Sequence, residues 1–283
     1  MEASMERQWW IERALMLVAL SAVGSLALIT LFIFSEGLPV LAKAGLSNFL
    51  LSSHWAPTKG HFGIFAMIVS SVLATLGALA IGVPLGLACA VVLAEFATPT
   101  MRLILKPAVE LLAGIPSVVY GFLGVVLLVP LIRDWLGGPG LSLLAVALIL
   151  GVMILPTIIS ISIDALRAVP RTYREASLAV GATQWQTIWR VVLPAARSGV
   201  VTAIILAMGR AIGETMAVIM VAGNALRLPH SPLDSVRTLT SNIALELGYA
   251  SGDHRAALFA TGLVLFAVIL VLNAAASLLR RQR

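Results

Sequence analysis

The chain has 283 residues, of which 60% are hydrophobic and 11% are charged, and its mean hydropathy is +1.02. A composition this apolar excludes a water-soluble globular domain and indicates an integral membrane protein. The formal net charge of +6 does not indicate a nucleic-acid partner, because basic residues gather at the cytoplasmic ends of membrane-spanning helices in any case.

Six apolar runs are long enough to cross a bilayer, which takes about 20 helical residues. They cover residues 14–34, 63–94, 108–131, 141–163, 195–222 and 257–279. The sequence therefore predicts an all-α membrane protein with six transmembrane helices. The first run is longer than the core of a secretory signal and is followed by no small-x-small cleavage site, so we expect it to remain as an uncleaved span.

The second run is long enough to hold two short helices, and Pro84, with Gly82 and Gly86 beside it, offers a place to break it. A proline within a transmembrane helix bends the helix more often than it ends it. We therefore predict one long, kinked helix.

The third run carries a proline and hydroxyl groups at positions that lipid does not favour. It opens with the sequence ELLAGIPSVVY, which begins at Glu110. Pro116 removes a backbone donor, so we expect the helix to bend or open locally between residues 114 and 117. Two interpretations of Ser117 and Tyr120 stay open. They pack against neighbouring helices, or they line a polar path across the membrane together with Glu110 and Pro116.

A polar segment, residues 165–194, separates the fourth and fifth runs. Thr172 to Glu175 match a capping box at the start of a short helix, and Gly181 permits the left-handed turn that ends it. Thr183 to Gln186 match a second capping box, which opens a helix that runs toward Pro194. We therefore predict a helix-turn-helix between two spans.

The polar segment also carries more apolar side chains than a surface loop needs, namely Val180, Trp185, Ile188 and Val191. A helix with such a face fits the groove of another subunit. A simpler interpretation is also physically sufficient, in which Glu175 is only a helix cap and Gly181 is only a turn.

The fifth run contains Arg210 and Glu214, which are four residues apart and hence on one face of the predicted helix. Arg210 lies about 18 Å along a helix that begins at Ser198, near the bilayer midplane, where a charge must be paired or hydrated. One interpretation is an ion pair that fixes helix register. The other is a guanidinium offered to an oxyanion that crosses the membrane, with Glu214 orienting it in the empty state. Gly209 and Gly213 would let another helix approach closely.

Two long connections, residues 35–62 and 223–256, lie on the side of the membrane opposite the polar segment. The first carries Trp55 and Pro57. The second contains an apolar repeat that predicts a surface helix stopped by Gly248. The repeat consists of Val236, Leu239, Ile243 and Leu247. The connections serve as an interfacial lid or as a dock for an extracytoplasmic partner, and both interpretations stay open.

The distribution of basic residues orients the spans. With both termini in the cytoplasm, the inner segments hold twelve Lys and Arg residues, the outer segments hold six, and Arg210 lies within a span. The inner residues are Arg7, Arg13, Arg102, Lys106, Arg167, Arg171, Arg174, Arg190, Arg197, Arg280, Arg281 and Arg283; the outer ones are Lys43, Lys59, Arg133, Arg227, Arg237 and Arg255. Because cytoplasmic loops carry the excess of basic residues, this count predicts that the polar segment and both termini lie inside the cell.

The spacing within the polar segment resembles the EAA motif of ABC importer permeases. Glu, Ala and a small residue are followed after three residues by Gly, and nine residues later by an aliphatic residue, any residue, Leu and Pro. The resemblance implies a type I ABC importer permease (MetI-like) fold, with this segment as a coupling helix in a cleft of an ATP-hydrolysing subunit. The residues implied in coupling are Glu175, Ala176, Ser177, Gly181, Trp185, Leu193 and Pro194.

The chain contains no G-x-x-x-x-G-K-[ST] phosphate loop, so we do not expect it to hydrolyse ATP or to be an enzyme. The resemblance implies that ATP and Mg²⁺ bind a partner subunit and that this chain binds no cofactor. We expect no metal site either, because the histidines all lie in the outer connections without ligand-like spacing. These are His54, His61, His230 and His254.

Three further segments, residues 110–121, 154–162 and 210–217, are similar to the permease subunit of the phosphate-specific ABC importer. Residues 218–224 favour the PstC type over its PstA-type partner. This resemblance implies inorganic phosphate as substrate, a second related permease, two ATP-binding subunits, an extracytoplasmic phosphate-binding protein and a place in the bacterial inner membrane. It divides the chain into an N-terminal part, residues 1–62, and a permease domain, residues 63–283.

Several alternatives remain from the residues alone. A single arginine does not distinguish phosphate from sulfate or molybdate. An ion-driven secondary transporter could use Arg210 and Glu214 as a proton-coupled pair, although no inverted repeat is evident and the helix-turn-helix would then have no purpose. A sensor of phosphate status would leave no mark in the sequence.

Overall fold

The computed structural model describes residues 2–281. In chain order its helices are α1 (Glu2–Ala44), α2 (Leu46–Leu51), α3 (Phe65–Val91), α4 (Pro99–Gly114), α5 (Ser117–Leu123), α6 (Val129–Leu136), α7 (Leu143–Arg167), α8 (Arg171–Ala179), α9 (Gln184–Thr187), α10 (Leu193–Gly213), α11 (Met216–Val221), α12 (Leu239–Glu246) and α13 (Gly252–Arg281). Strands β1 (Trp55–Ala56) and β2 (His61–Phe62) form an antiparallel hairpin across a 3-10 turn, Pro57–Lys59. Arg283, which the charge count includes, lies outside the described residues.

Within the described residues, six helical segments are long and apolar enough to cross a membrane, as predicted. They are Trp9–Lys43, Phe65–Phe96, Ser117–Leu136, Leu143–Arg167, Gln184–Gly213 and Gly252–Leu278. Three contain a π-helical turn, at Val92–Phe96, Gly124–Leu128 and Ile188–Val192. The predicted class, an all-α protein with six transmembrane helices, is confirmed, while the boundaries of the third and fifth spans differ from the prediction.

The third span begins at Ser117 and not at residue 108. Residues 108–114 belong to α4, a separate helix whose first turn is capped by the Thr98 side chain. Ile115 and Pro116 are extended, with ψ angles of 126° and 141°. The predicted opening around Pro116 is therefore confirmed, and it separates two helices because the proline cannot continue the hydrogen-bond ladder.

The second span is one helix, as predicted, and it packs along α7. Pro84 lies inside α3 without interrupting it. A Cβ atom at Gly82 would lie 2.7 Å from the Ile154 side chain, and one at Gly86 would lie 2.8 Å from Ile158. Glycine is therefore required at both positions for the close approach of the two helices.

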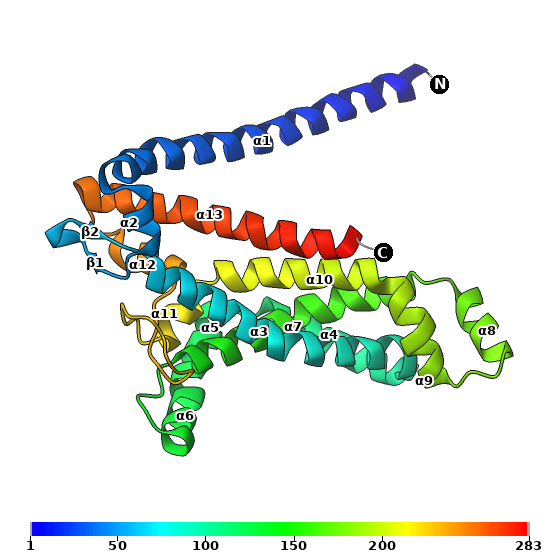
Figure 1. Cartoon of the computed structure of the whole chain (residues 1–283). Coiled ribbons are helices and arrows are strands. Elements are labelled where there is room, and N and C mark those ends of the chain that lie inside the picture. Colours follow the sequence, from blue (N-terminus) through cyan, green and yellow to red (C-terminus); the bar gives the residue numbers. More distant parts are fainter. Residues whose placement is uncertain (1, 282–283) are drawn as a thin grey trace.

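The bundle has two distinct ends (Figure 1). The α8–α9 end holds those two helices, the start of α1 and the finish of α13, whereas the hairpin end holds α2, β1, β2 and α12. One cluster of buried side chains fills the centre between α3, α7, α10 and α11, and a further cluster fills each end. Because the described chain has six spans, the start of its first helix and the end of its last helix lie on the same side of the membrane. Helix α8 follows the fourth span and therefore lies on that side too.

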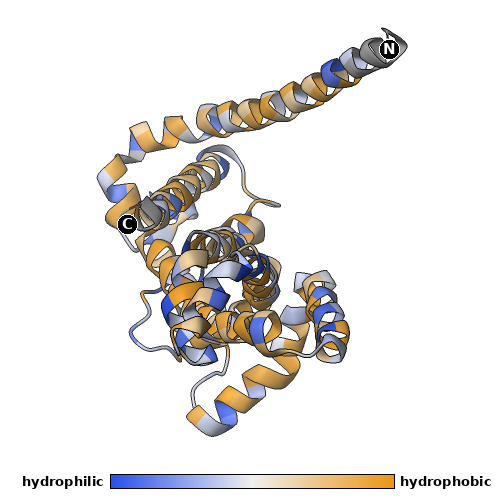
Figure 2. Ribbon diagram, turned by 90° about the vertical axis from the view of Figure 1, so that its right-hand side faces the viewer, coloured by the Kyte–Doolittle hydropathy of each residue, from blue (hydrophilic) through white to orange (hydrophobic). Residues whose placement is uncertain are grey.

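Helix α1 extends away from the rest of the bundle (Figure 2). It contacts α13, where Phe32 packs edge-on against Phe259 with ring centroids 5.5 Å apart. Farther toward the N-terminus its apolar side chains are exposed, including Leu17 and Leu31. A surface of this kind requires a surrounding of lipid or other membrane helices.

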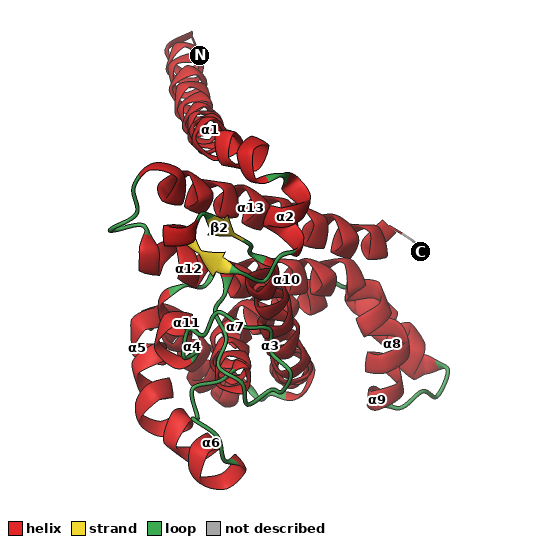
Figure 3. Cartoon of the chain, turned by 60° about the vertical axis from the view of Figure 1, so that its left-hand side comes forward, coloured by secondary structure: helices red, strands yellow, loops and turns green. Residues whose placement is uncertain are grey.

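The predicted helix in the second outer connection forms as α12, but its position at the surface is wrong, because most of one face is buried. Helix α12 packs against α3, α11 and α13, and Figure 3 shows the hairpin strands close to α12 and α13. Leu239 and Val236 are fully buried, and Thr238 and Ser241 cap the helix reciprocally. The first two residues of the apolar repeat therefore face the protein interior, where neighbouring helices cover them, whereas Leu247 is 43% exposed.

Candidate functional site

The predicted helix-turn-helix forms, but only α8 and the turn after it lie between the fourth and fifth spans, because α9 is the start of the continuous helical segment Gln184–Gly213. Helix α8 is followed by Gly181, whose φ angle of +84° lies in the left-handed region that favours glycine. Thr183 and Gln186 form the predicted capping box, since each side chain accepts a hydrogen bond from the backbone N–H of the other. The second half of the segment therefore confirms the prediction.

The first capping box is absent, and its prediction is wrong. Helix α8 begins at Arg171 with Pro170 at its N-cap, where no side chain provides a cap. Pro170 has the extended conformation that its ring favours, and its carbonyl accepts the N–H of Tyr173. The helix therefore starts before Thr172, and Glu175 is an exposed residue rather than the partner of a cap.

Most of the residues predicted to couple to a partner are exposed on this segment, namely Glu175, Ala176, Gly181, Trp185 and Pro194. Ser177 is partly buried, and its hydroxyl lies 2.9 Å from that of Thr187. Leu193 packs on the buried cluster at the α8–α9 end.

The apolar surface of the segment differs in part from the prediction. Val180 and Trp185 are 84% and 56% exposed, whereas Ile188 is 1% exposed and belongs to the core. Two aromatic residues that sequence reasoning did not assign to this surface extend it: Phe96 and Trp189 lie 6.2 Å and 5.8 Å from Trp185, between ring centroids. Ile188 is buried because it packs in the cluster at the α8–α9 end, whereas Trp189, in the same π-helical turn, is exposed.

A cavity of about 310 Å³ lies between α8 and the ends of α3 and α7. Its charged lining residues are Glu95, Arg102, Arg167, Arg171, Arg174 and Glu175. Within it, Arg174 forms an ion pair with Glu95 at 2.6 Å. Sequence reasoning missed Glu95, because it lies 79 residues from Arg174 and no local pattern marks it.

Arg210 and Glu214 do not share a helix face, so the predicted pairing is wrong. Helix α10 ends at Gly213, and Glu214 is extended, with φ −68° and ψ 132°. The Arg210 Nη1 atom lies 3.5 Å from the Thr157 hydroxyl on α7. The Glu214 carboxylate instead accepts the N–H of Ala217 at 3.2 Å, in the first turn of α11. The break in the helix thus turns Glu214 away from its expected partner.

The glycines beside Arg210 face open space. A Cβ atom at Gly209 or Gly213 would meet no atom within 4 Å. The close approach of another helix, which the G-x-x-x-G pattern predicts, therefore does not come from the part of this chain that the structure describes.

The residues predicted around the third span meet at the break between α4 and α5. Tyr120 is buried, and its hydroxyl donates to the Leu112 carbonyl at 2.8 Å, which bridges the break. Pro116 and Glu110 line a cavity of about 500 Å³ beside it. Ser117 is the first residue of α5. Tyr120 also belongs to the central core, together with the residues of α10 that flank Arg210.

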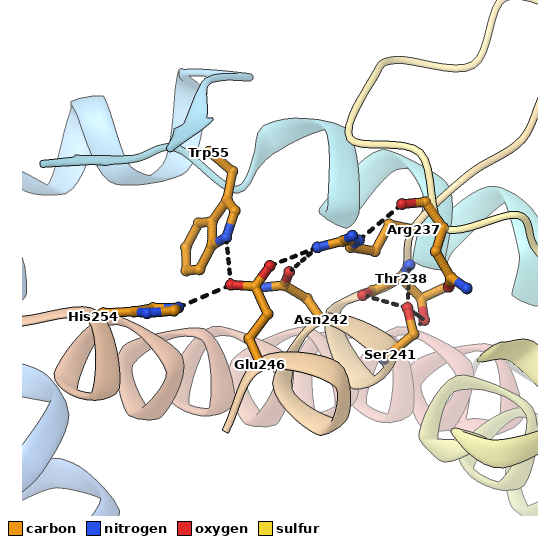
Figure 4. Close-up of polar contacts among 8 residues, drawn as sticks. Trp55, Arg237, Thr238, Ser241, Asn242, Glu246 and His254 are labelled. Atoms are coloured by element: carbon orange, nitrogen blue, oxygen red, sulfur yellow. Dashed lines mark hydrogen bonds and ion pairs between the residues drawn. The ribbon is translucent and has the colours of Figure 1, made fainter. Parts of the chain in front are cut away.

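A buried polar network at the hairpin end was not predicted (Figure 4). Glu246 on α12 accepts hydrogen bonds from Arg237 at 2.7 Å and from the Trp55 indole at 2.8 Å, and its other contact is His254 at 2.8 Å. Arg237 also donates to Asn242 at 3.1 Å. These residues come from both outer connections and from α13, so only the folded chain brings them together.

The turn before this network is fixed by Asp234. The backbone N–H groups of His230 and Ser231 donate to its carboxylate at 2.8 Å and 2.9 Å. These hydrogen bonds stabilise the charged form and hold the pKa of Asp234 below its usual range.

Comparison with known proteins places the chain in a family. Residues 82–283 match the model of the binding-protein-dependent transport system inner membrane component. A probable ABC transporter permease of Bacillus subtilis, YqgH, is 44% identical over 255 residues, which cover 87% of this chain and 82% of that protein. The phosphate transport system permease protein PstC of Mesorhizobium japonicum is 37% identical over 285 residues, covering 93% and 86%.

Solved structures share the fold. A bacterial ABC transporter involved in alginate import superposes with a TM-score of 0.65 at 16% identity, covering 98% of this chain and 99% of the other. The MetNI methionine ABC transporter gives a TM-score of 0.57 at 22% identity, covering 77% and 93%. These likenesses confirm the type I ABC importer permease fold that the EAA spacing implied. The chain therefore belongs to the binding-protein-dependent transport system inner membrane component family, the permease subunits of ABC importers, and its relatives include the PstC proteins.

Proposed function

We propose that this chain is the permease subunit of an ATP-driven importer that moves inorganic phosphate into the cytoplasm by alternating access. The observation that carries the proposal is the match to phosphate transport system permease proteins over most of both chains, including 93% of this one. Arg210 lies in a membrane span, and its described side-chain contact is the Thr157 hydroxyl and not a carboxylate. Such a guanidinium suits the binding of a tetrahedral oxyanion.

The importer would contain a second, PstA-type permease, two ATP-binding subunits that hold ATP and Mg²⁺, and an extracytoplasmic phosphate-binding protein. It would lie in a bacterial inner membrane with both termini in the cytoplasm. The position of α8 and α9 at the same end as both ends of the chain supports this orientation, as does the excess of basic residues there. Residues 1–62 would then add a span and an outer connection to the permease domain, residues 63–283.

The exposed residues of α8, α9 and the turn between them would form the contact with the ATP-binding subunit. Val180 and Trp185 offer that subunit apolar surface, and Glu175 offers a charge. An amphipathic helix seated in a partner groove is a common mode of recognition. Closure of the ATP-binding subunits would then move the spans.

The substrate path would pass between Arg210 and the break at Pro116. Arg210 would bind the anion, and Ser117, Tyr120 and Glu110 would surround the opening between α4 and α5. Glu214 would hold the start of α11 and not orient Arg210, because its carboxylate binds the backbone of that helix. The alternative of an ion-coupled secondary transporter depended on a pair formed by Arg210 and Glu214. These two residues have different partners, so this alternative loses its support.

The proposal is tested by reconstituting the chain in liposomes with its partner permease, its ATP-binding subunit and its binding protein. We expect ATP-dependent, vanadate-sensitive uptake of radiolabelled phosphate. Uptake of sulfate or molybdate in place of phosphate would assign the importer to another oxyanion, and uptake without ATP would contradict the proposal as a whole.

A further inference from the structure

Glu95 lies at the α8–α9 end of the second span, in the π-helical turn Val92–Phe96 that continues α3. Its side chain is 10% exposed. Its two carboxylate oxygens accept from Nη2 of Arg174 at 2.6 Å and from Nε at 3.1 Å. This two-bond arrangement between a guanidinium and a carboxylate has a defined geometry, and burial protects it from screening by salt.

Arg174 also reaches the end of a second core span. Its Nη1 atom donates to the Val169 carbonyl at 2.8 Å, and Nη2 donates to the Leu166 carbonyl at 2.9 Å. The Leu166 carbonyl is in the last turn of α7 and the Val169 carbonyl lies two residues beyond the helix, at the end where the helix dipole favours a cation. One side chain of α8 therefore binds the ends of α3 and α7, which pack along each other.

The second helix of the segment is attached to the same residue. The Gln184 side chain, at the start of α9, donates to the Glu95 backbone carbonyl at 3.3 Å. The carbonyls just before it, of Leu93 and Ala94, accept from Arg102 of α4 at 3.0 Å and 2.8 Å. The π-helical turn is thereby held by α4, α8 and α9 together.

Packing alone does not hold α8 to the bundle, because none of its described side chains is buried. The polar contacts of Arg174 and the hydroxyl contact of Ser177 with Thr187 carry that attachment. A displacement of α8 by a partner subunit therefore reaches the spans through these contacts, in addition to the backbone connections of α8 to α7 and α9. Of these contacts, the Arg174–Glu95 pair is the one that joins α8 directly to the second span.

We propose that Glu95 and Arg174 are the positioning residues through which movement of α8 and α9 is transmitted to the ends of α3 and α7. The inference rests on the proposed function, since it presumes that an ATP-binding subunit moves this segment. Neither residue contacts the substrate. Their pair couples ATP hydrolysis to the opening and closing of the path.

The test is Glu95→Gln in the reconstituted importer, which keeps the shape of the side chain and removes its charge. We expect phosphate uptake to fall by about tenfold or more while ATP hydrolysis continues, because a two-bond ion pair becomes a single hydrogen bond from the guanidinium to an uncharged amide oxygen. The ratio of phosphate moved to ATP hydrolysed then falls. Arg174→Lys should lower the same ratio, since an ammonium does not reproduce the fork of a guanidinium.

Asp253→Asn is the matched control, because it removes an exposed ion pair with Lys43 that joins the last turn of α1 to the first turn of α13, far along the chain from α8 and α9. It should leave the ratio unchanged. Glu95→Asp, which keeps the charge, should restore coupling in part. A normal ratio in assembled Glu95→Gln and Arg174→Lys complexes would overturn the inference.

Failure of both variants to assemble would also overturn it, by showing that the pair only holds the fold. If only the Glu95→Gln complex fails to assemble, the Arg174→Lys complex provides the test. A normal ratio of phosphate moved to ATP hydrolysed in that complex would overturn the inference. Absence of phosphate uptake by the unaltered importer would instead contradict the proposed function, so the two failures are distinguishable.

Discussion

Arg210 lies in the last turn of α10, and its guanidinium is 3.5 Å from the Thr157 hydroxyl. A permanently charged group within a membrane span is stable only with hydrogen-bonding partners, with water or with an opposite charge. Because the helix ends at Gly213, the Glu214 carboxylate turns to α11 and does not neutralise Arg210. The charge of Arg210 therefore remains available to an anion.

Arg210→Gln tests this availability. We expect the variant to assemble with its partners but to lose phosphate uptake by roughly tenfold to a hundredfold, because hydrogen bonds to charged groups contribute about 1.5–3 kcal/mol. Uptake is measured in liposomes and assembly by size-exclusion chromatography. Thr157→Val is the companion variant and should have the smaller effect, since it removes one hydroxyl and no charge. Loss of the assembled complex in Arg210→Gln would instead indicate a structural role.

At the scale of an element, the turn between α8 and α9 depends on Gly181. Its φ angle is +84°, yet a Cβ atom there would meet no other atom within 4 Å. The requirement for glycine is therefore conformational and not steric. A residue with a branched Cβ is strained in this conformation, whereas asparagine adopts it more readily.

Gly181→Val should uncouple the ATP-binding subunit while the protein remains in the membrane. The left-handed conformation is unfavourable by about 1–2 kcal/mol for a residue with a Cβ atom, so the turn should rearrange and displace α9. Phosphate uptake and ATP hydrolysis are measured on the same liposomes. Gly181→Asn should behave like the unaltered protein. Unchanged uptake in Gly181→Val would contradict the assignment of this segment to coupling.

Helix boundaries show where sequence patterns stop being informative. Pro116 predicted an opening after Gly114, whereas the apolar run at 195–222 suggested one continuous span and the chain breaks after Gly213. A mean over many residues does not detect such breaks. The first break depends on Pro116, and the second on an acceptor for the freed backbone groups of α11, the Glu214 carboxylate.

At the scale of the whole molecule, the network around Glu246 joins parts of the chain that are distant in sequence. Trp55 comes from the first outer connection, Arg237 and Glu246 from the second, and His254 from α13. The Glu246 and Arg237 side chains are 9% and 15% exposed. This network therefore links the first outer connection to the second and to α13 at the hairpin end.

Glu246→Gln should lower the thermal stability of the purified protein in detergent, because it leaves the buried Arg237 without its counter-charge. Breaking a buried ion pair at one partner destabilises proteins by about 3–5 kcal/mol. The midpoint of thermal unfolding measures the effect. Asp253→Asn, which removes an exposed pair, should change stability by about 1 kcal/mol or less. Equal midpoints for the two variants would contradict this role of the network.

The sequence by itself determined the membrane class, six spans, the helix-turn-helix with Gly181 and the family resemblance, because each depends on composition or on spacing over a short stretch. Only the tertiary structure decided that Ile188 and α12 are buried, that Arg210 and Glu214 are separate, and that Glu95 holds Arg174. Those properties depend on which distant residues meet. Burial and ion pairing depend on which residues are neighbours in space, and a pattern within a short stretch of sequence does not identify those neighbours.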